Sequence, residues 1–372
     1  MRIAQVAPLY EAVPPQLYGG TERVVAHLTD ALVDLGHSVT LFATAEAQTR
    51  ANLVAVRDQA IRLDPAPLKS DLAAHLTMMG ELRRRLGDFD VVHFHTDMVH
   101  FPMFGDVAGC TVTTLHGRLD LKDLPPVYRR WREFPLVSIS FDQRKPLAFA
   151  NWVATVHHGL SPDHYRFHNR GEGYLAFLGR ISPEKRPDRA IEIARRCGKP
   201  LKMAAKVDAA DRSYWSDVVE PMVCAEPLVQ FIGEIGDSDK SAFLGGADAL
   251  LFPIDWPEPF GLVMIEAMAC GTPVIAFNCG SVPEVVEPGV TGFIVDDIDG
   301  AVAAVRRLPE IPRTQVRRRF EARFSSHEMA RRYLDVYETV SSDMTKRDPA
   351  IALHHDPLEK RSAPEYGRWT VP

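Results

Sequence analysis

Two glutamates bracket the start of a strongly apolar helix. From Leu262 to Ala269 every residue is apolar except Glu266, and a helix that is apolar all round is predicted to be buried. A lone carboxylate there is costly unless it is paired or hydrogen-bonded, and the two hydroxyls of a ribose would suit it. Glu258 lies just before the helix, whose first turn offers free backbone N–H groups for sugar hydroxyls and a phosphate: Phe260, Gly261 and Leu262. The alternative is that Glu266 pairs with a buried arginine and Glu258 only complements the helix dipole.

A pair of cations follows a predicted strand in the second half of the chain. Arg180 and Lys185 come directly after the apolar run Tyr174–Leu178 and before a helix opened by Pro187. A guanidinium fork and a point charge together suit a pyrophosphate. Solvated surface charges are the usual fate of such residues. Their position at the carboxyl end of a strand favours the phosphate role.

A glycine pair ends the loop after the first predicted strand. Gly19 and Gly20 lie where the helix Glu22–Leu35 begins, so their N–H groups could approach a phosphate or a sugar. The alternative is a turn that needs positive φ. The loop lacks the G-x-G-x-x-G spacing, so a nicotinamide enzyme gets no support.

Alternating strands and helices must position these residues, and the alternation occurs twice. The strands are nearly continuous in apolar residues, as expected of parallel strands covered on both faces. The sequence predicts an α/β protein of two doubly wound, Rossmann-like domains facing a cleft, where ligands meet the carboxyl ends of the strands. The expected division is a first domain, a linker, a second domain, a final helix with the capping box Ser325-x-x-Glu328, and a tail: 1–157, 158–172, 173–325, 326–340 and 341–372.

Composition narrows the class of protein. The chain has 372 residues, 46% of them hydrophobic, and a net charge of −6, which suits two globular domains and gives no sign of nucleic-acid binding. No apolar run approaches the ~20 residues that span a bilayer. The first residues read as a strand and not as a signal peptide, and five dispersed cysteines indicate reduced thiols. We therefore expect a cytoplasmic protein.

The segment from Glu258 to Ala276 resembles the signature of the family 4 retaining glycosyltransferases, with Glu258 and Glu266 as its E-x7-E element. The resemblance covers roughly residues 1 to 340. It also includes Gly19-Gly20, the turn Thr114–Gly117, Gly179-Arg180 with Lys185, and the run Gly280–Glu284. It implies the GT-B fold, with the C-terminal helix returning to the first domain.

The resemblance also implies roles for the site residues. Glu258 would hold donor-sugar hydroxyls near C3, and Glu266 would hold the ribose. Arg180 and Lys185 would neutralise the departing diphosphate, which Gly19 and Gly20 would line from the other domain; the first turn 260–262 completes the donor site. His116 would lie beside the sugar at the reaction centre, or else be a hydrogen-bonded core histidine.

The implied activity is hexosyl transfer with retention, from a nucleotide diphosphate-sugar to an acceptor hydroxyl on a small molecule or glycan. UDP-glucose is the best candidate donor. No cofactor or metal is expected if the two cations stabilise the leaving group. Three D-x-D triplets read as caps and turns: Asp88/Asp90, Asp237/Asp239 and Asp297/Asp299. Alternatives are a nucleotide-sugar 2-epimerase of the same fold and a non-catalytic nucleotide-sugar binder.

The acceptor side is predicted in the first domain, in the loops 97–105 and 119–134. Within the second loop, Val127–Phe134 mixes arginine with aromatic residues, which suits either peripheral membrane contact or a solvated helix face. The stretch Gln5–Val25 resembles a bacterial subset that includes pterin glucosyltransferases, a lead towards a small acceptor.

Overall fold

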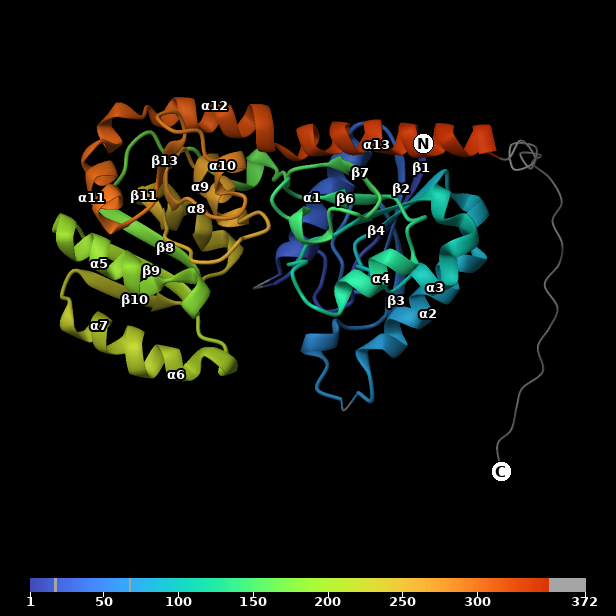
Figure 1. The fold of residues 1–372 in the computed structure, drawn as a ribbon, viewed down its shortest axis with the longest axis horizontal. Helices are drawn as coiled ribbons and strands as arrows, with labels where there is room; N and C mark the ends of the chain where they lie inside the picture. Colours follow the sequence, from blue (N-terminus) through green and yellow to red (C-terminus); the bar gives the residue numbers. More distant parts are fainter. Residues whose placement is uncertain (17–18, 67, 348–372) are drawn as a thin grey trace.

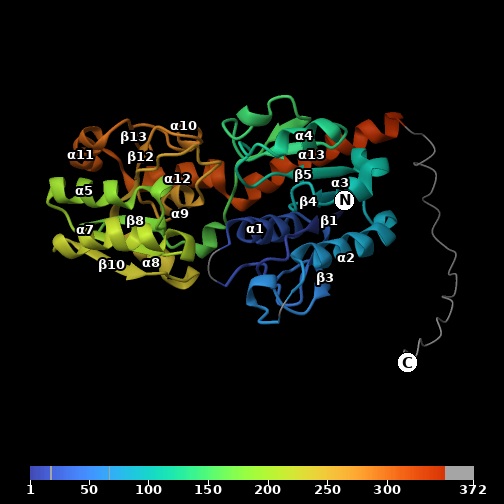
Figure 2. The same cartoon turned by 60° about the horizontal axis from the view of Figure 1, so that its bottom comes forward.

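The computed structural model describes residues 1–16, 19–66 and 68–347, with side chains up to residue 341. Two parallel β-sheets, each flanked by helices, lie side by side (Figures 1 and 2). The predicted class, two Rossmann-like α/β domains, is confirmed. The predicted tail lies outside the described residues from 348 onward.

The first sheet has seven parallel strands in the order β3-β2-β1-β4-β5-β6-β7. Its order reverses between β1 and β4, and such a switch point is where this architecture binds ligands. The strands run β1 Arg2–Val6, β2 Ser38–Thr44, β3 Asn52–Arg57, β4 Val91–Phe94, β5 Thr111–Thr114, β6 Leu136–Ser138 and β7 Trp152–Thr155. The sequence did not predict β3, because this edge strand offers only the four-residue apolar run Leu53–Val56 and none of its residues is fully buried.

The second sheet has six parallel strands in the order β10-β9-β8-β11-β12-β13. The order reverses between β8 and β11, so the end of β8, with Arg180, opens at the second switch point. The strands run β8 Tyr174–Arg180, β9 Leu201–Lys206, β10 Val229–Gly233, β11 Ala247–Phe252, β12 Val274–Phe277 and β13 Gly292–Val295.

Helices connect the strands and cover the sheets. In the first domain they are α1 Gly20–Asp34, α2 Asp71–Arg84, α3 Phe101–Phe104 and α4 Leu124–Arg130. In the second they are α5 Pro187–Cys197, α6 Arg212–Tyr214, α7 Glu220–Ala225, α8 Asp237–Gly246, α9 Leu262–Ala269, α10 Val282–Val285, α11 Ile298–Arg306 and α12 Arg313–Phe324. Helix α9 is buried as its composition predicts, from Met264 to Ala269.

The last helix, α13 (Ser326–Arg347), leaves the second domain and runs across the first (Figure 1). Its buried residues join the core formed by α1 and the first sheet: Met329, Ala330, Tyr333, Val336, Tyr337 and Val340. The predicted return of this helix to the first domain is confirmed, and the described helix extends seven residues past the expected end. Where it begins, Leu160 in the expected linker exchanges backbone hydrogen bonds with Phe324 and Ser326, both 2.9 Å long. The linker is thereby tied to the junction of α12 and α13.

Candidate active site

A cleft of about 710 Å³ opens where the carboxyl ends of the two sheets face each other. Its walls carry Pro8 after β1, Thr96 after β4, the end of β8 and Ile254 after β11. Ten residues predicted from the sequence all line it: Gly19, Gly20, His116, Arg180, Lys185, Glu258, Phe260, Gly261, Leu262 and Glu266.

Glu258 is held in a narrow turn at the start of α9. Its carboxylate forms an ion pair with Lys185 and accepts a hydrogen bond of 3.0 Å from the indole N–H of Trp256. Gly261 lies in the left-handed region (φ 78°), and so does Gly280 (φ 57°). A side chain at Gly280 would come within 2.4 Å of the Glu258 backbone nitrogen, so only glycine allows this close approach.

Glu266 is buried eight residues further on, with 3% of its surface exposed. It accepts hydrogen bonds from Lys240 Nζ (3.0 Å) and Tyr165 Oη (3.1 Å), both at Oε1. Burial alone would raise the pKa of Glu266, but the charges of Lys240 and Arg23 outweigh it and hold the pKa below its ordinary value. The sequence left open that Glu266 pairs with a buried arginine; its hydrogen-bonded partner is instead the lysine Lys240. Both of these hydrogen bonds use Oε1, so Oε2 is the atom suited to a ribose diol.

The two predicted phosphate-binding cations are engaged by carboxylates. Lys185 pairs with Glu258, as above. Arg180 pairs with Glu184 and lies 3.8 Å from Asp208 and 3.9 Å from Asp211. Its side chain is 35% exposed, so it can turn towards a ligand in the cleft.

The glycine pair meets the cleft at the N-terminus of α1. Neither glycine lies in the left-handed region of backbone space, and Gly19 is extended (φ 171°), so the turn alternative does not explain them. Gly19 is required by close packing, since a Cβ there would lie 2.7 Å from Pro15. A Cβ on Gly20 would be 3.5 Å from Leu262 of the other domain. The first turn of a 15-residue helix, with its free N–H groups, therefore faces α9 across the cleft.

His116 ends a buried chain of hydrogen bonds that reaches α13. Its Nε2 lies 2.8 Å from His95 Nδ1, and His95 Nε2 lies 2.8 Å from Gln5 Oε1. Gln5 Nε2 donates to Tyr337 Oη at 3.0 Å, which lies 2.8 Å from His93 Nδ1. The histidine is both a cleft residue and a hydrogen-bonded one, so the two alternatives for His116 are not exclusive.

The chain fixes the tautomer of His116. The Gln5 oxygen faces His95, so His95 Nε2 carries the hydrogen and Nδ1 accepts. His116 Nε2–H then donates to His95, which leaves His116 Nδ1 as an acceptor; it has no partner within the described part of the chain. Burial lowers the pKa of His116 to about 3, so the ring is neutral at pH 7. A neutral ring with a bare nitrogen can accept a hydrogen bond from a sugar hydroxyl.

Several polar residues of the site were not predicted. Lys240, Tyr165 and Trp256 contact the two glutamates, and Arg23 on α1 forms an ion pair with Asp237 on α8, across the cleft. His93 in β4 and His95 directly after it are two residues apart, so their side chains lie on the same face of the sheet, and this spacing was the local signal for the pair. Trp256 is only two residues from Glu258, whereas Lys240, Tyr165 and Arg23 lie far from their partners in the sequence and carry no local pattern.

The three aspartate triplets have partners in the protein. Asp297 caps α11, accepting from Gly300 N at 2.7 Å, as predicted. Asp90 pairs with Arg2 and Asp299 with Arg196. Asp237 differs from these aspartates, because its partner Arg23 belongs to the other domain. Over residues 1–16, 19–66 and 68–347, no group of three His, Cys, Asp or Glu side chains is placed to hold a metal ion. All five cysteines are free thiols.

The suspected acceptor loops differ in position. Asp97, Met98 and Val99 line the cleft, and Asp97 adopts a left-handed backbone (φ 48°). Its surface is solvent-exposed, yet desolvation by the surrounding walls raises the pKa of Asp97 to about 6. In the second loop, Tyr128 and Phe134 are buried in the first-domain core. This inward packing does not suit a membrane-binding face. Among the described residues no helix is long and apolar enough to cross a bilayer.

Comparison with known proteins agrees with this geometry. Residues 166–323 match the model for glycosyl transferases group 1, and residues 18–154 match that for Glycosyltransferase Family 4. Two facing Rossmann-like domains with the site in their cleft define a GT-B glycosyltransferase. The chain belongs to the family 4 glycosyltransferases.

Relatives and solved structures support the assignment. The phosphatidyl-myo-inositol mannosyltransferase of Mycolicibacterium smegmatis is 28% identical, over 96% of this chain and 98% of that protein. A D-inositol 3-phosphate glycosyltransferase from a Mycobacterium species is 33% identical, over 53% of this chain and 46% of that protein. AviGT4, a glycosyltransferase of avilamycin A biosynthesis, has a TM-score of 0.70 at 24% identity, covering 92% and 98% of the two chains. HepE of Anabaena, solved with UDP and glucose, has a TM-score of 0.70 at 16% identity, covering 91% and 100%.

Proposed function

We propose that this glycosyltransferase moves a hexosyl group, with retention, from a nucleotide diphosphate-sugar to an acceptor hydroxyl on a small molecule or glycan. UDP-glucose is the best candidate donor. The observation that carries the proposal is the grouping of two cations, two glutamates and two helix N-termini around one cleft. The HepE structure, which contains UDP and glucose, supports the choice of donor.

Each part of the cleft has a task in this reaction. Arg180, Lys185 and the N-terminus of α1 stabilise the negative charge that grows on the departing diphosphate. The diphosphate competes with Glu258 for Lys185, which frees the carboxylate to bind donor-sugar hydroxyls. Glu266 holds the ribose through Oε2, and His116 Nδ1 accepts a hydrogen bond from the sugar. The acceptor hydroxyl attacks from the face that the diphosphate leaves, and a phosphate oxygen takes its proton.

The acceptor enters on the first-domain side of the cleft, beside Asp97. The names of the two mycobacterial relatives both include an inositol compound. A polyhydroxylated acceptor is therefore the first class to try. The five free cysteines support a reducing compartment, and we propose the cytoplasm.

The donor assay distinguishes this proposal from its alternative. UDP-glucose is incubated with the protein, with and without polyol acceptors, and the products are separated. Release of UDP with a new α-glucoside supports retaining transfer. A 2-epimerised sugar nucleotide formed without acceptor would instead show an isomerase.

We also propose that turnover needs no metal ion, because Arg180 and Lys185 supply the positive charge at the diphosphate. Transfer should therefore continue in EDTA at an unchanged rate. Loss of activity in EDTA that Mg²⁺ or Mn²⁺ restores would contradict this. Asp237 would then be the first carboxylate to reconsider, since it lies beside Lys240 at the cleft.

A further inference from the structure

A short segment of the second domain, Gly280–Glu284, contacts both halves of the cleft. On its own side, Ser281 N donates to the Glu258 carbonyl at 3.0 Å, and Ser281 Oγ donates to the Phe260 carbonyl at 2.8 Å. The Ser281 side chain is fully buried. These bonds hold the turn that carries Glu258 in its place.

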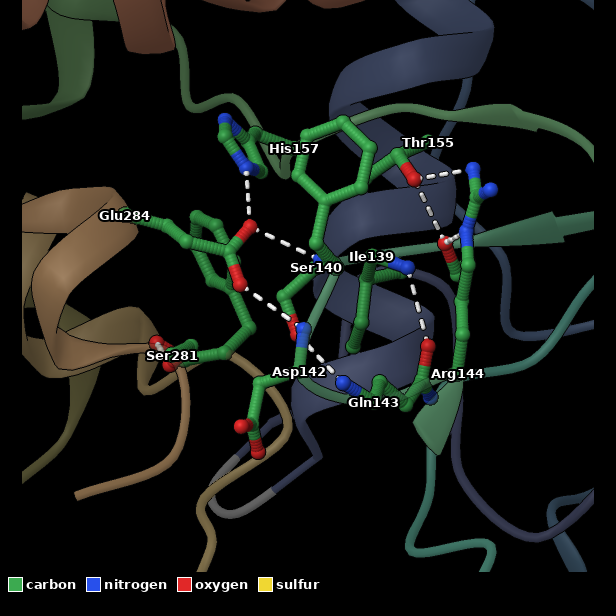
Figure 3. Close-up of polar contacts among 12 residues, drawn as sticks. Ile139, Ser140, Asp142, Gln143, Arg144, Thr155, His157, Ser281 and Glu284 are labelled. Atoms are coloured by element: carbon green, nitrogen blue, oxygen red, sulfur yellow. Dashed lines mark hydrogen bonds and ion pairs between the residues drawn. The ribbon is translucent and has the colours of Figure 1, made fainter. Parts of the chain in front are cut away.

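At its other end the segment reaches the first domain. The Glu284 carboxylate accepts hydrogen bonds from the backbone N–H groups of Phe141 and Asp142, both 2.8 Å long, in the loop after β6 (Figure 3). His157, after β7, lies 3.2 Å from the same carboxylate. Burial raises the pKa of Glu284, but the bonds from His157 and the two N–H groups outweigh this effect and leave the pKa lowered. The carboxylate is therefore charged at pH 7 and bound on three sides.

The next residue of that loop, Gln143, holds the turn that carries His116. Its Nε2 donates to the carbonyls of Leu115 and Gly117, both at 2.8 Å, one on each side of His116. Its Oε1 accepts from Ile139 N at 2.9 Å, and its own N–H donates to Ser140 Oγ at 3.1 Å (Figure 3). The buried amide is fully engaged, so a shift of the loop displaces the His116 turn with it.

We propose that Glu284 is a positioning residue that sets the distance between His116 in one domain and Glu258 in the other. Ser281 holds the turn of Glu258, and Glu284 binds the backbone of residues 141–142. Gln143, the next residue, binds the backbone on both sides of His116 and so couples the position of this loop to that of His116. The effect on turnover rests on the proposed transferase function; the effect on the His116 environment does not. A displacement of about 1 Å between two groups that share a substrate can lower turnover about 100-fold.

A neighbouring carboxylate supplies the matched control. Glu287 lies three residues further on and pairs with Arg319 and Arg323, both in α12 of its own domain. Glu287→Gln removes the charge of a nearby carboxylate, together with its ion pairs, without touching the first domain. General loss of charge or stability near α10 would affect both variants; a positioning role affects only Glu284.

The first measurement compares E284Q, Q143A, their double variant and E287Q. With UDP as probe, calorimetry should give affinities within about twofold of the parent for all four, because Arg180, Lys185 and Glu266 are unchanged. Turnover of UDP-glucose should fall about 10- to 100-fold in E284Q and in Q143A. The double variant should be no slower than the slower single variant, since both act through one loop. E287Q should match the parent.

The second measurement follows the His116 ring directly. In protein labelled with ¹³C-histidine, the His116 imidazole signal is assigned by its loss in H116N. It should shift or broaden in E284Q and Q143A and stay in place in E287Q. Parent-like turnover and a parent-like His116 signal in E284Q would overturn the proposal, and so would losses that add in the double variant. If the parent itself does not turn over UDP-glucose, the proposed donor is wrong, and the His116 signal still decides the role of Glu284.

Discussion

Glu258 and Glu266 belong to one sequence element yet lie in different electrostatic surroundings. Glu258 lies in the turn before α9 and pairs with Lys185, a partly buried cation that lines the cleft and can also bind a ligand there. Glu266 is buried against Lys240 and Tyr165. The first can change partners during a reaction, whereas the second is fixed. This difference predicts two different consequences when each charge is removed.

Glu258→Gln should lower kcat more than it raises the donor KM, because a sugar contact tightens as charge develops at the anomeric carbon. Glu266→Gln should mainly weaken UDP binding. It should also lower the free energy of unfolding by about 1–3 kcal/mol, since Lys240 loses its buried charged partner. The check is UDP calorimetry, steady-state transfer and urea unfolding on both variants. The assignment fails if Glu258→Gln loses UDP affinity as strongly as Glu266→Gln, or if Glu266→Gln binds UDP like the parent.

The residues that line the cleft could be read from residue types and spacing, because parallel strands end at one edge of a sheet and ligands bind at that edge. The residues that contact these side chains could not be predicted in the same way. Lys240 reaches Glu266 from another helix, and Tyr165 reaches it from the expected linker, so no local spacing shows either contact. The sequence likewise gave no sign that Lys185 and Glu258 would be paired with each other.

At the scale of elements, α13 does more than close the first domain. Tyr337 is fully buried and connects Gln5, and through it His95 and His116, to the core of the first sheet. Tyr333 binds Thr114 at 2.8 Å, at the far end of the same network. A helix whose return was predicted only as packing thus also orients a cleft histidine.

Tyr337→Phe should lower the free energy of unfolding by about 1–3 kcal/mol, because it leaves the Gln5 amide and His93 Nδ1 unpaired in the core. It should also lower kcat, since the Gln5 amide is then free to turn and reverse the tautomer of His116. Tyr333→Phe is the matched control. It removes an equivalent hydroxyl from the same helix but leaves the hydrogen bond between Tyr337 and Gln5 intact. Urea unfolding and steady-state transfer are measured for both variants. Equal kcat values in the two would contradict the inference that Tyr337 orients His116 through Gln5 and His95.

Element boundaries show where pattern reading fails. The apolar run Tyr174–Leu178 and helix α9 lie where the sequence places them, because burial on both faces leaves a clear signal. The edge strand β3 was missed because its apolar run is only four residues long and none of its residues is fully buried. The end of α13 was placed too early, at residue 340, although Lys346, Arg347 and Pro349 are the residue types that usually mark the end of a helix.

At the scale of the whole molecule, neutral histidines concentrate in the interior. Burial lowers the pKa of six of them: His27, His93, His95, His100, His116 and His158. For His27 and His116 it falls to about 3. The unfolded chain binds protons at these rings near pH 6.5, whereas the folded protein does not.

Stability should therefore fall as the pH drops below about 6.5, by up to about 1.4 kcal/mol per pH unit for each ring. The sign follows because the unfolded state takes up more protons in that window. Above pH 7 the six rings are neutral in both states and add no slope. Urea unfolding at pH 8, 7, 6 and 5.5 tests this; equal midpoints at pH 7 and 5.5 would show that the buried rings are protonated in the folded state.

The central claim is that the cleft binds a nucleotide diphosphate through Arg180 and Lys185. It is tested most directly by calorimetric titration of UDP, GDP and ADP into the parent, R180A and K185A, with R195A as the control. Arg195 lies on α5 and pairs with Glu192 outside the cleft. We expect one site per chain for at least one nucleotide. Its affinity should fall about 10- to 150-fold in R180A and in K185A, the scale of a charge-assisted hydrogen bond, and stay unchanged in R195A. Failure of all three nucleotides to bind, or parent-like affinity in both cleft variants, would contradict it.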